Sequence, residues 1–232
     1  MRLPKHDLPG ILIAFEGIDG CGKSTQIEMI KRDVEGLGWS SDFVFTKQPG
    51  ATALGAAIRN ILFHNGTALH SMEPDAASLL FAAAHTQALR EIVYPALRDG
   101  KVVIADRWCA YSDTVFGMHG LARPISPALR VLRESLGGPE PDLLFFMVGH
   151  PATMLKRAQE RLGEQHQKAK PWANIETLER IQAAYWELFG EIPRVHRGGP
   201  LYEIQAEHAP EKIFCQDVWP AIMGALSAKR SA

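Results

Sequence analysis

The chain of 232 residues contains little cysteine and no excess of charge of one sign. Its three cysteines, Cys21, Cys109 and Cys215, are dispersed and form no C-x-x-C pair. This odd number argues against a disulfide framework and against a structural zinc site, so we expect reduced thiols. Lysine and arginine number 25, against 26 aspartate and glutamate residues. Such a balance provides no general field that would attract a nucleic acid or an anionic membrane.

Long hydrophobic runs are also absent near the start of the chain. The apolar run Ile11 to Phe15 is too short to cross a bilayer, and Glu16 follows it. We therefore expect no signal peptide, no transmembrane helix and a cytoplasmic location. Hydrophobic residues make up 46% of the chain, which is enough for a full-sized core.

Short apolar runs alternate with stretches of helical spacing along the chain. Strands are predicted at residues 11–16, 43–45, 102–105, 143–148 and 201–204. Helices are predicted at residues 23–37, 53–63, 73–98, around 111, at 151–162 and at 210–226. This alternation predicts an α/β fold of three layers, in which helices cover both faces of a five-stranded parallel sheet.

Two segments depart from this regular pattern. Pro95 lies inside the predicted helix 73–98 and is expected to kink or end it, because proline lacks the amide donor that a helix interior requires. The polar segment 163–173 carries Lys168 and Lys170 and has no apolar period, so we interpret it as a mobile lid.

A phosphate-binding pattern follows the first predicted strand. Residues 17–24 read G-I-D-G-C-G-K-S and satisfy G-x-x-x-x-G-K-[ST] between a strand and a helix, the context that this pattern requires. Main-chain amides of such a loop point at phosphate oxygens, and the lysine reaches the β and γ phosphates. The predicted ATP-binding residues are Gly17, Gly20, Cys21, Gly22, Lys23, Ser24 and Thr25.

A magnesium site is predicted beside this loop. Asp106 ends the apolar run 102–105, and a carboxylate at the tip of a core strand is the usual partner of a nucleotide's metal ion. The hydroxyl of Ser24 is the second predicted Mg²⁺ ligand. A structural alternative remains open, in which Asp106 and Arg107 only close a turn through an ion pair.

The segment F-E-G-I-D-G-C-G-K-S-T-Q at residues 15–26 resembles the opening of thymidylate kinases. Three further blocks agree in order: T-K-Q-P-G-A-T at 46–52, L-L-F-A-A at 79–83 and D-R-W at 106–108. The likeness extends from Ile11 to about Tyr185. It implies one P-loop kinase domain over residues 1–232 that phosphorylates a deoxynucleoside monophosphate with ATP and Mg²⁺, and it implies a homodimer.

The resemblance also implies roles for individual residues. Arg59 and Arg107 match the arginines that hold the acceptor's phosphate, a task that suits paired guanidinium groups. Phe81 matches the ring on which the base stacks, and Ser112 matches a hydrogen-bonding residue beside the base. Asp19 matches an acidic loop residue near the acceptor's sugar and phosphate. The catalytic set is therefore Lys23, Asp19, Arg107 and Arg59.

Departures from the family pattern cluster around the base and the lid. His85 replaces an arginine that reads the thymine carbonyl, and Phe116 replaces a glutamine of many bacterial members. The lid lacks the usual D-R element, which leaves Arg161, Lys168 and Lys170 as its candidate cations. A pocket with these changes favours stacking and apolar contact over paired hydrogen bonds. We therefore expect an acceptor that is thymidylate or a related 5-substituted pyrimidine deoxynucleotide.

Two other classes of function compete with the kinase. A GTPase-type switch is disfavoured because the sequence has no guanine-reading N-K-x-D motif. A catalytically degenerate nucleotide-binding protein with a regulatory role stays open, because the changed lid could abolish catalysis and leave binding intact. Acceptor-dependent release of ADP distinguishes a kinase from such a binding protein.

Overall fold

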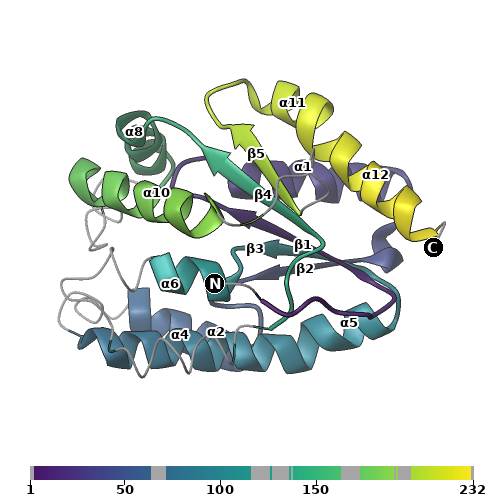
Figure 1. Cartoon of the computed structure of the whole chain (residues 1–232), viewed down its shortest axis with the longest axis horizontal. Coiled ribbons are helices and arrows are strands. Elements are labelled where there is room, and N and C mark those ends of the chain that lie inside the picture. Colours follow the sequence, from purple (N-terminus) through teal and green to yellow (C-terminus); the bar gives the residue numbers. More distant parts are fainter. Residues whose placement is uncertain are drawn as a thin grey trace.

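A computed structural model of the chain describes residues 3–63, 72–115, 126, 136, 138–162, 173–190, 192 and 200–230. Its strands are β1 (Ile11–Glu16), β2 (Phe43–Lys47), β3 (Val102–Asp106), β4 (Leu143–Val148) and β5 (Leu201–Gln205). All neighbouring strands are parallel, and they form one sheet in the order β2-β3-β1-β4-β5 (Figure 1). The predicted five-stranded parallel sheet is therefore confirmed.

The register of the sheet brings the ends of three strands together. Asp106 at the end of β3 is in register with Phe15 of β1 on one side and with Lys47 of β2 on the other. In β1, β3 and β4 every residue is buried, as expected for strands that are covered on both faces. The segments that follow β1, β2 and β3 therefore emerge at one edge of the sheet, where open parallel sheets bind ligands.

Helices cover both faces of this sheet. They are α1 (Lys23–Gly36), α2 (Ala53–Phe63), α4 (Pro74–Ala88), α5 (Tyr94–Arg98), α6 (Cys109–Val115), α8 (Pro151–Leu162), α10 (Ile175–Gly190), α11 (Pro210–Ile213) and α12 (Trp219–Arg230). Figure 1 shows α1, α11 and α12 along one side of the sheet and α4 and α5 along the other. The three-layer arrangement predicted from the sequence is therefore present.

Two prolines are accommodated by π-helical turns. The turn Leu89–Val93 precedes Pro95, and the turn Phe214–Val218 precedes Pro220. In each case the residue just before the proline donates its N–H to the carbonyl five residues back, as Tyr94 does to Leu89. The wider turn absorbs the missing proline donor. Pro95 thus changes the hydrogen bonding of the helical path but does not end it, because the path continues to Arg98.

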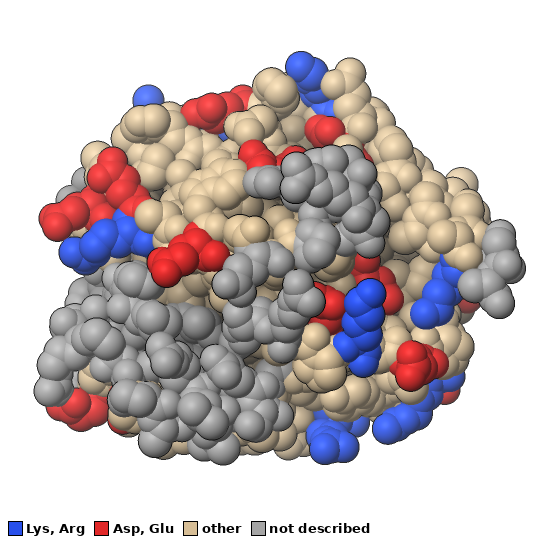
Figure 2. Space-filling view, viewed as in Figure 1, with Lys and Arg blue, Asp and Glu red and all other residues tan. Residues whose placement is uncertain are grey.

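In the described part of the chain, no helix is both long enough and apolar enough to span a lipid bilayer. The three cysteines are free thiols, with Cys21 and Cys109 buried and Cys215 exposed. The predicted lid lies outside the described residues except for Ala173. Figure 2 shows positive and negative side chains interspersed over the face in view, in keeping with the balanced composition.

Candidate active site

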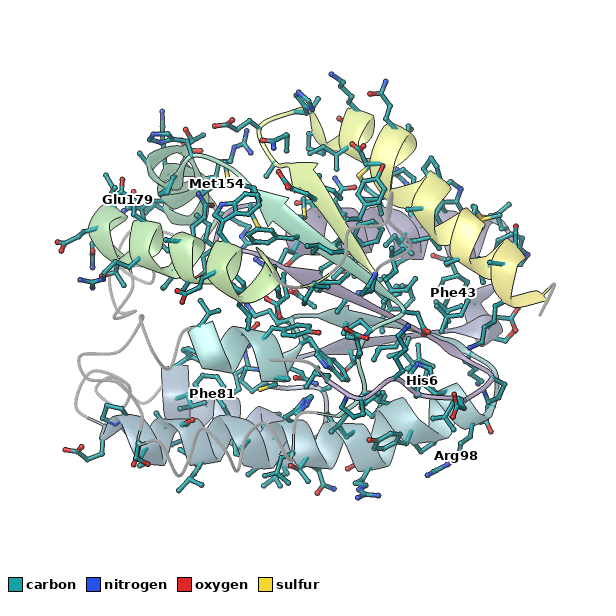
Figure 3. All side chains as sticks on the ribbon, in the orientation of Figure 1. His6, Phe43, Phe81, Arg98, Met154 and Glu179 are labelled. Atoms are coloured by element: carbon teal, nitrogen blue, oxygen red, sulfur yellow. The ribbon has the colours of Figure 1, made fainter. Side chains whose placement is uncertain are left out.

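The phosphate-binding loop joins β1 to α1 and depends on three glycines with positive φ. Gly17, Gly20 and Gly22 have φ angles of 134°, 86° and 89°. A Cβ on Gly20 would lie 1.9 Å from the carbonyl oxygen of Met154, and one on Gly17 would lie 2.4 Å from that of Met147. Figure 3 labels Met154 on α8, beside the loop. Only glycine fits this cradle, so the loop has the close backbone curvature that phosphate binding needs.

Lys23 is the first residue of α1 and lies against the loop. Its side chain is buried, and Nζ donates to the carbonyl oxygens of Gly17 and Ile18 at 3.0 and 2.9 Å. The same Nζ lies 3.4 Å from Sγ of Cys21. The ammonium group of Lys23 is therefore held against the curled backbone, and its contact with the β and γ phosphates stays a prediction.

Ser24 and Asp106, the two predicted magnesium ligands, lie next to each other. The Ser24 hydroxyl donates to Oδ2 of Asp106 at 3.0 Å, and Nζ of Lys47 is 3.5 Å from the same oxygen. Burial raises the pKa of Asp106, but Lys23, Lys47, Arg107 and the Ser24 hydrogen bond outweigh this effect and hold it below its usual value. An ionised carboxylate beside a hydroxyl is a fitting donor set for Mg²⁺.

Arg107 follows β3 and points back at the loop. Its guanidinium donates to Oδ1 of Asp19 at 2.6 Å and to the carbonyl oxygen of Gly17 at 3.0 Å. Burial lowers the pKa of Arg107, but Asp19, Tyr185, Glu16 and Asp106 raise it above its ordinary value. Arg107 and Asp19 therefore form an ion pair beside the phosphate-binding loop.

Arg59, on α2, faces the same region. Burial lowers the pKa of Arg59, and the neighbouring Arg107 also lowers it. The carboxylates of Asp106 and Asp19 act in the opposite direction, but the pKa stays below its ordinary value. Its Nη1 donates to the carbonyl oxygen of Pro49 at 3.1 Å. The two predicted acceptor arginines therefore lie within electrostatic reach of each other and of the predicted magnesium carboxylate.

Aromatic side chains adjoin Arg59. The guanidinium of Arg59 lies 5.4 Å from the centre of the Phe63 ring, and the Phe63 and Phe81 rings meet edge to face at 6.1 Å. Phe81 is on α4, where its carbonyl oxygen accepts a hydrogen bond from Sγ of Cys109 on α6 (Figure 3). The predicted stacking residue thus lies in the same region as the predicted phosphate ligands.

His85 is buried and is hydrogen-bonded to Gln48. Oε1 of Gln48 accepts from the main-chain N–H of Cys109 at 3.0 Å and lies 2.7 Å from Nδ1 of His85. Because Oε1 is an acceptor, Nδ1 of His85 carries the proton. The His85 ring also packs edge to face on Trp108 at 5.0 Å and is 3% exposed. Gln48 belongs to the block 46–52, and its partnership with His85 emerges only from the structure.

Glu16 and Ser112 form a buried contact behind Arg107. The Ser112 hydroxyl donates to Oε1 of Glu16 at 2.6 Å, so Ser112 is already engaged inside the protein. The base contact predicted for Ser112 stays a prediction. Burial raises the pKa of Glu16, and the nearby Arg107 and the hydrogen bonds of Ser112, Trp108 and Tyr185 act against that rise.

A cavity of about 320 Å³ opens on the other side of the phosphate loop. Its lining includes Thr25 and Gln26 of α1, Arg157 and Arg161 of α8, and His208 in the segment after β5. Nη1 of Arg157 donates to the carbonyl oxygen of Ala206 at 2.7 Å and fixes that segment. Sequence reasoning missed Arg157 and His208. The spacing of Arg157 and Arg161, four residues apart on one helix face, was the available signal.

Several predicted residues lie outside the described residues: Phe116, Lys168 and Lys170. The lid cation Arg161 is described and lines the cavity beside the loop. Among the described residues, no group of three or more histidine, cysteine, aspartate or glutamate side chains is arranged to hold a metal ion.

Comparison with known proteins agrees with this geometry. The family model described as thymidylate kinase matches residues 15–205. The chain is 34% identical over 186 residues to a thymidylate kinase of Kosmotoga olearia, covering 79% of this chain and 84% of that one. It is 32% identical over 229 residues to that of Pelotomaculum thermopropionicum, covering 95% and 96%.

Among solved structures, thymidylate kinase from Ehrlichia chaffeensis shares the fold, with a TM-score of 0.67 and 21% sequence identity. The likeness covers 92% of this chain and 98% of that one. The phosphate loop, the carboxylate at the end of β3 and the match over residues 15–205 together establish that the chain belongs to the thymidylate kinase family.

Proposed function

We propose that the chain transfers the terminal phosphoryl group of ATP to thymidylate or a related 5-substituted pyrimidine deoxynucleotide. Membership of the family makes the chain an ATP-dependent nucleoside monophosphate kinase that uses Mg²⁺. The observation that supports the residue roles is the meeting of three groups at one edge of the sheet. They are the Lys23 loop, the pair of Ser24 and Asp106, and the arginines Arg59 and Arg107.

On the donor side, loop amides and Lys23 would hold the β and γ phosphates. The nucleoside would extend into the 320 Å³ cavity, where Arg157 and Arg161 supply positive charge and flat guanidinium surfaces. Ser24 and Asp106 would hold Mg²⁺, which neutralises charge on the phosphates when bound. These residues position the donor and stabilise charge, and they supply no covalent step.

On the acceptor side, Arg59 and Arg107 would bind the dianionic phosphate and align it with the donor. Phe81 would stack on the base, and Asp19 would orient Arg107 through their 2.6 Å contact. His85 is turned toward Gln48. Recognition of the base therefore depends more on stacking and shape than on a charged side chain at position 85.

Steady-state assays with a panel of monophosphates test the proposal. We expect ADP release that depends on thymidylate, deoxyuridylate or a 5-substituted deoxyuridylate and that is weak with purine monophosphates. No ADP release with any acceptor, together with tight ATP binding, would instead support the nucleotide-binding protein. A clear preference for thymidylate over its 5-substituted relatives would remove the wider acceptor class.

We also propose a homodimer that forms through α2 and α4. These helices pack on each other and present large apolar side chains to the exterior: Leu54, Ile61 and Leu79 are 47%, 40% and 49% exposed. Such a surface is typical of an interface.

We expect Leu54→Asp to shift the sedimentation coefficient from dimer to monomer. Leu37→Asp, a substitution at the residue that follows α1 and is 51% exposed, should leave the dimer intact. A monomeric parent protein would contradict the proposal.

The same proposal includes a single kinase domain over residues 1–232 and a cytoplasmic location. The balanced charge of the sequence, and the mixed charge of the described residues on the one face in Figure 2, support the expectation that neither nucleic acid nor membrane is a partner. Limited proteolysis that yields one resistant core, and fractionation that places the protein with cytoplasmic markers, are the expected results.

A further inference from the structure

Glu16 is a buried carboxyl group to which the proposed mechanism assigns no task. It is the last residue of β1 and has 0% exposure. Burying a carboxyl group without need is costly, because water stabilises its charge far better than a protein interior does. A group of this kind, one residue before the phosphate loop, therefore requires a physical explanation.

The backbone beside Glu16 turns sharply at Arg107. Arg107 has a φ of 74° and is the only residue other than glycine with positive φ among the described residues. This conformation is unfavourable for a residue with a Cβ. The turn is held on both sides: the N–H of Arg107 donates to the carbonyl oxygen of Phe15 at 3.1 Å, and the N–H of Trp108 donates to Oε1 of Glu16 at 2.6 Å.

Donors from three other directions reach the same carboxyl group. The Ser112 hydroxyl on α6 donates to Oε1 at 2.6 Å, and the Tyr185 hydroxyl on α10 donates to Oε2 at 2.8 Å. Nη1 of Arg107 lies 3.8 Å from Oε2. These contacts all offer hydrogens to Glu16, so the group is matched to an ionised carboxylate.

We propose that Glu16, held in place by Ser112 and Tyr185, is a positioning residue for Arg107. It stabilises both the strained backbone turn and the guanidinium, and it thereby sets the direction from which Arg107 meets the acceptor's phosphate. The inference rests on the proposed role of Arg107 in acceptor binding. It gives α10 a function in the site through a single hydroxyl group, although α10 contributes no predicted ligand.

Tyr185→Phe is the sharpest test because it removes one donor and keeps the ring. The ring packs on Phe146 and Phe189 at 5.5 and 5.4 Å, and these contacts survive the change. We expect the KM for the acceptor to rise about tenfold, since small displacements of a positioning group cost up to about 100-fold. The KM for ATP should stay the same. Tyr202→Phe on β5 removes a phenol hydroxyl that bonds Asp217 and is the matched control.

A second variant tests the link to Arg107 itself. Glu16→Gln keeps the shape of the side chain, but its amide hydrogens must face either Tyr185 and Arg107 or Trp108 and Ser112, all of which are donors here. We expect kcat/KM for the acceptor to fall about 100-fold in the parent protein. In an Arg107→Lys background, Glu16→Gln should change kcat/KM for the acceptor little, because the guanidinium that Glu16 positions is already absent.

The outcomes separate this inference from the proposed function. No acceptor-dependent turnover in the unaltered protein would overturn the proposed function. Normal turnover with equal acceptor KM in Tyr185→Phe and Tyr202→Phe would overturn the positioning role alone. A rise in the KM values for ATP and acceptor by the same factor in Tyr185→Phe would also overturn the positioning role. The same holds if Glu16→Gln lowers kcat/KM for the acceptor equally in the parent protein and in the Arg107→Lys background. If Glu16→Gln fails to fold, the Tyr185→Phe comparison still decides.

Discussion

On the proposed donor side of the site, the groups that would bind phosphate belong to one short stretch of chain, residues 17–24, and most of them are main-chain atoms. On the proposed acceptor side, the corresponding groups are side chains from separate elements: Arg59 on α2, Phe81 on α4, and Asp19 and Arg107 in segments after β1 and β3. Behind them lie buried polar pairs such as Gln48 and His85. The donor half therefore depends on local backbone geometry, whereas the acceptor half depends on tertiary packing.

This difference has a physical basis. A triphosphate is the same in every donor nucleotide, so a rigid curl of amides can bind it. An acceptor must be identified by its base and sugar as well as its phosphate, which requires directional side chains. Side chains from distant elements hold their directions only when other groups support them, and here buried hydrogen bonds provide that support.

Removing the donor cation should have the largest effect. Lys23→Ala deletes the ammonium group at the centre of the loop, and we expect kcat to fall on the order of 1000-fold or more. Steady-state assays at saturating ATP measure this. Lys31→Ala removes an exposed lysine of the same helix that pairs with Glu28, and it should retain full turnover. Near-normal turnover of Lys23→Ala would refute the donor assignment.

Breaking the acceptor-side polar pair should cost folding stability. Gln48→Leu leaves the buried N–H groups of Cys109 and His85 without their shared acceptor, at about 1–3 kcal/mol for each donor. His85→Leu leaves the bond between Gln48 and Cys109 in place and should cost less. Urea denaturation measures both variants. The double variant should be less destabilised than the sum of the two, because the groups share one network.

Two results would contradict this shared hydrogen-bond network. One is an equal loss of unfolding free energy in the two single variants, and the other is a double variant whose loss equals the sum of the two. The same denaturation experiment compares the two sides of the site. On the donor side, replacing an exposed side chain of α1 should leave the free energy of unfolding nearly unchanged.

Gly20 and Gly38 have similar positive φ angles but different surroundings, so replacing each with alanine distinguishes a steric clash from backbone strain. Gly20 has φ 86° and would place a Cβ against the carbonyl oxygen of Met154, whereas Gly38 has φ 73° and open space around it. We expect Gly38→Ala to cost about 1 kcal/mol and Gly20→Ala about 2–3 kcal/mol. Thermal unfolding and the Kd for ATP are the measurements. Only Gly20→Ala should weaken ATP binding.

The smallest effect is expected from changing one acceptor arginine conservatively. Arg59→Lys keeps the positive charge but loses the planar fork, so the KM for the acceptor should rise about tenfold with little change in the KM for ATP. Initial-rate measurements with each substrate varied in turn give both constants. Arg98→Lys at the end of α5 is a control away from the site. A rise in the KM for ATP alone would move Arg59 to the donor side.

The fold was largely predictable because its elements have strong local patterns. The strands 11–16 and 143–148 and the helices 53–63 and 151–162 have the predicted bounds. The π-helical turns before Pro95 and Pro220 were not predictable, since a proline can end, kink or widen a helix and tertiary packing selects among these. The phosphate-binding loop was recognisable in the sequence because its residues are consecutive in the chain, and its contacts with ATP stay a prediction.

The amino-acid sequence by itself determined the alternation of strands and helices, the glycine-rich curl and the lysine and serine that follow it. Only the tertiary structure decided that His85 faces Gln48, that Arg157 and His208 line a cavity beside the loop, and that Tyr185 reaches Glu16 across 169 positions of the chain. Local patterns record backbone preferences and burial, which act between near neighbours in the chain. Hydrogen bonds between buried side chains depend on which elements pack together, and that is set by the whole fold.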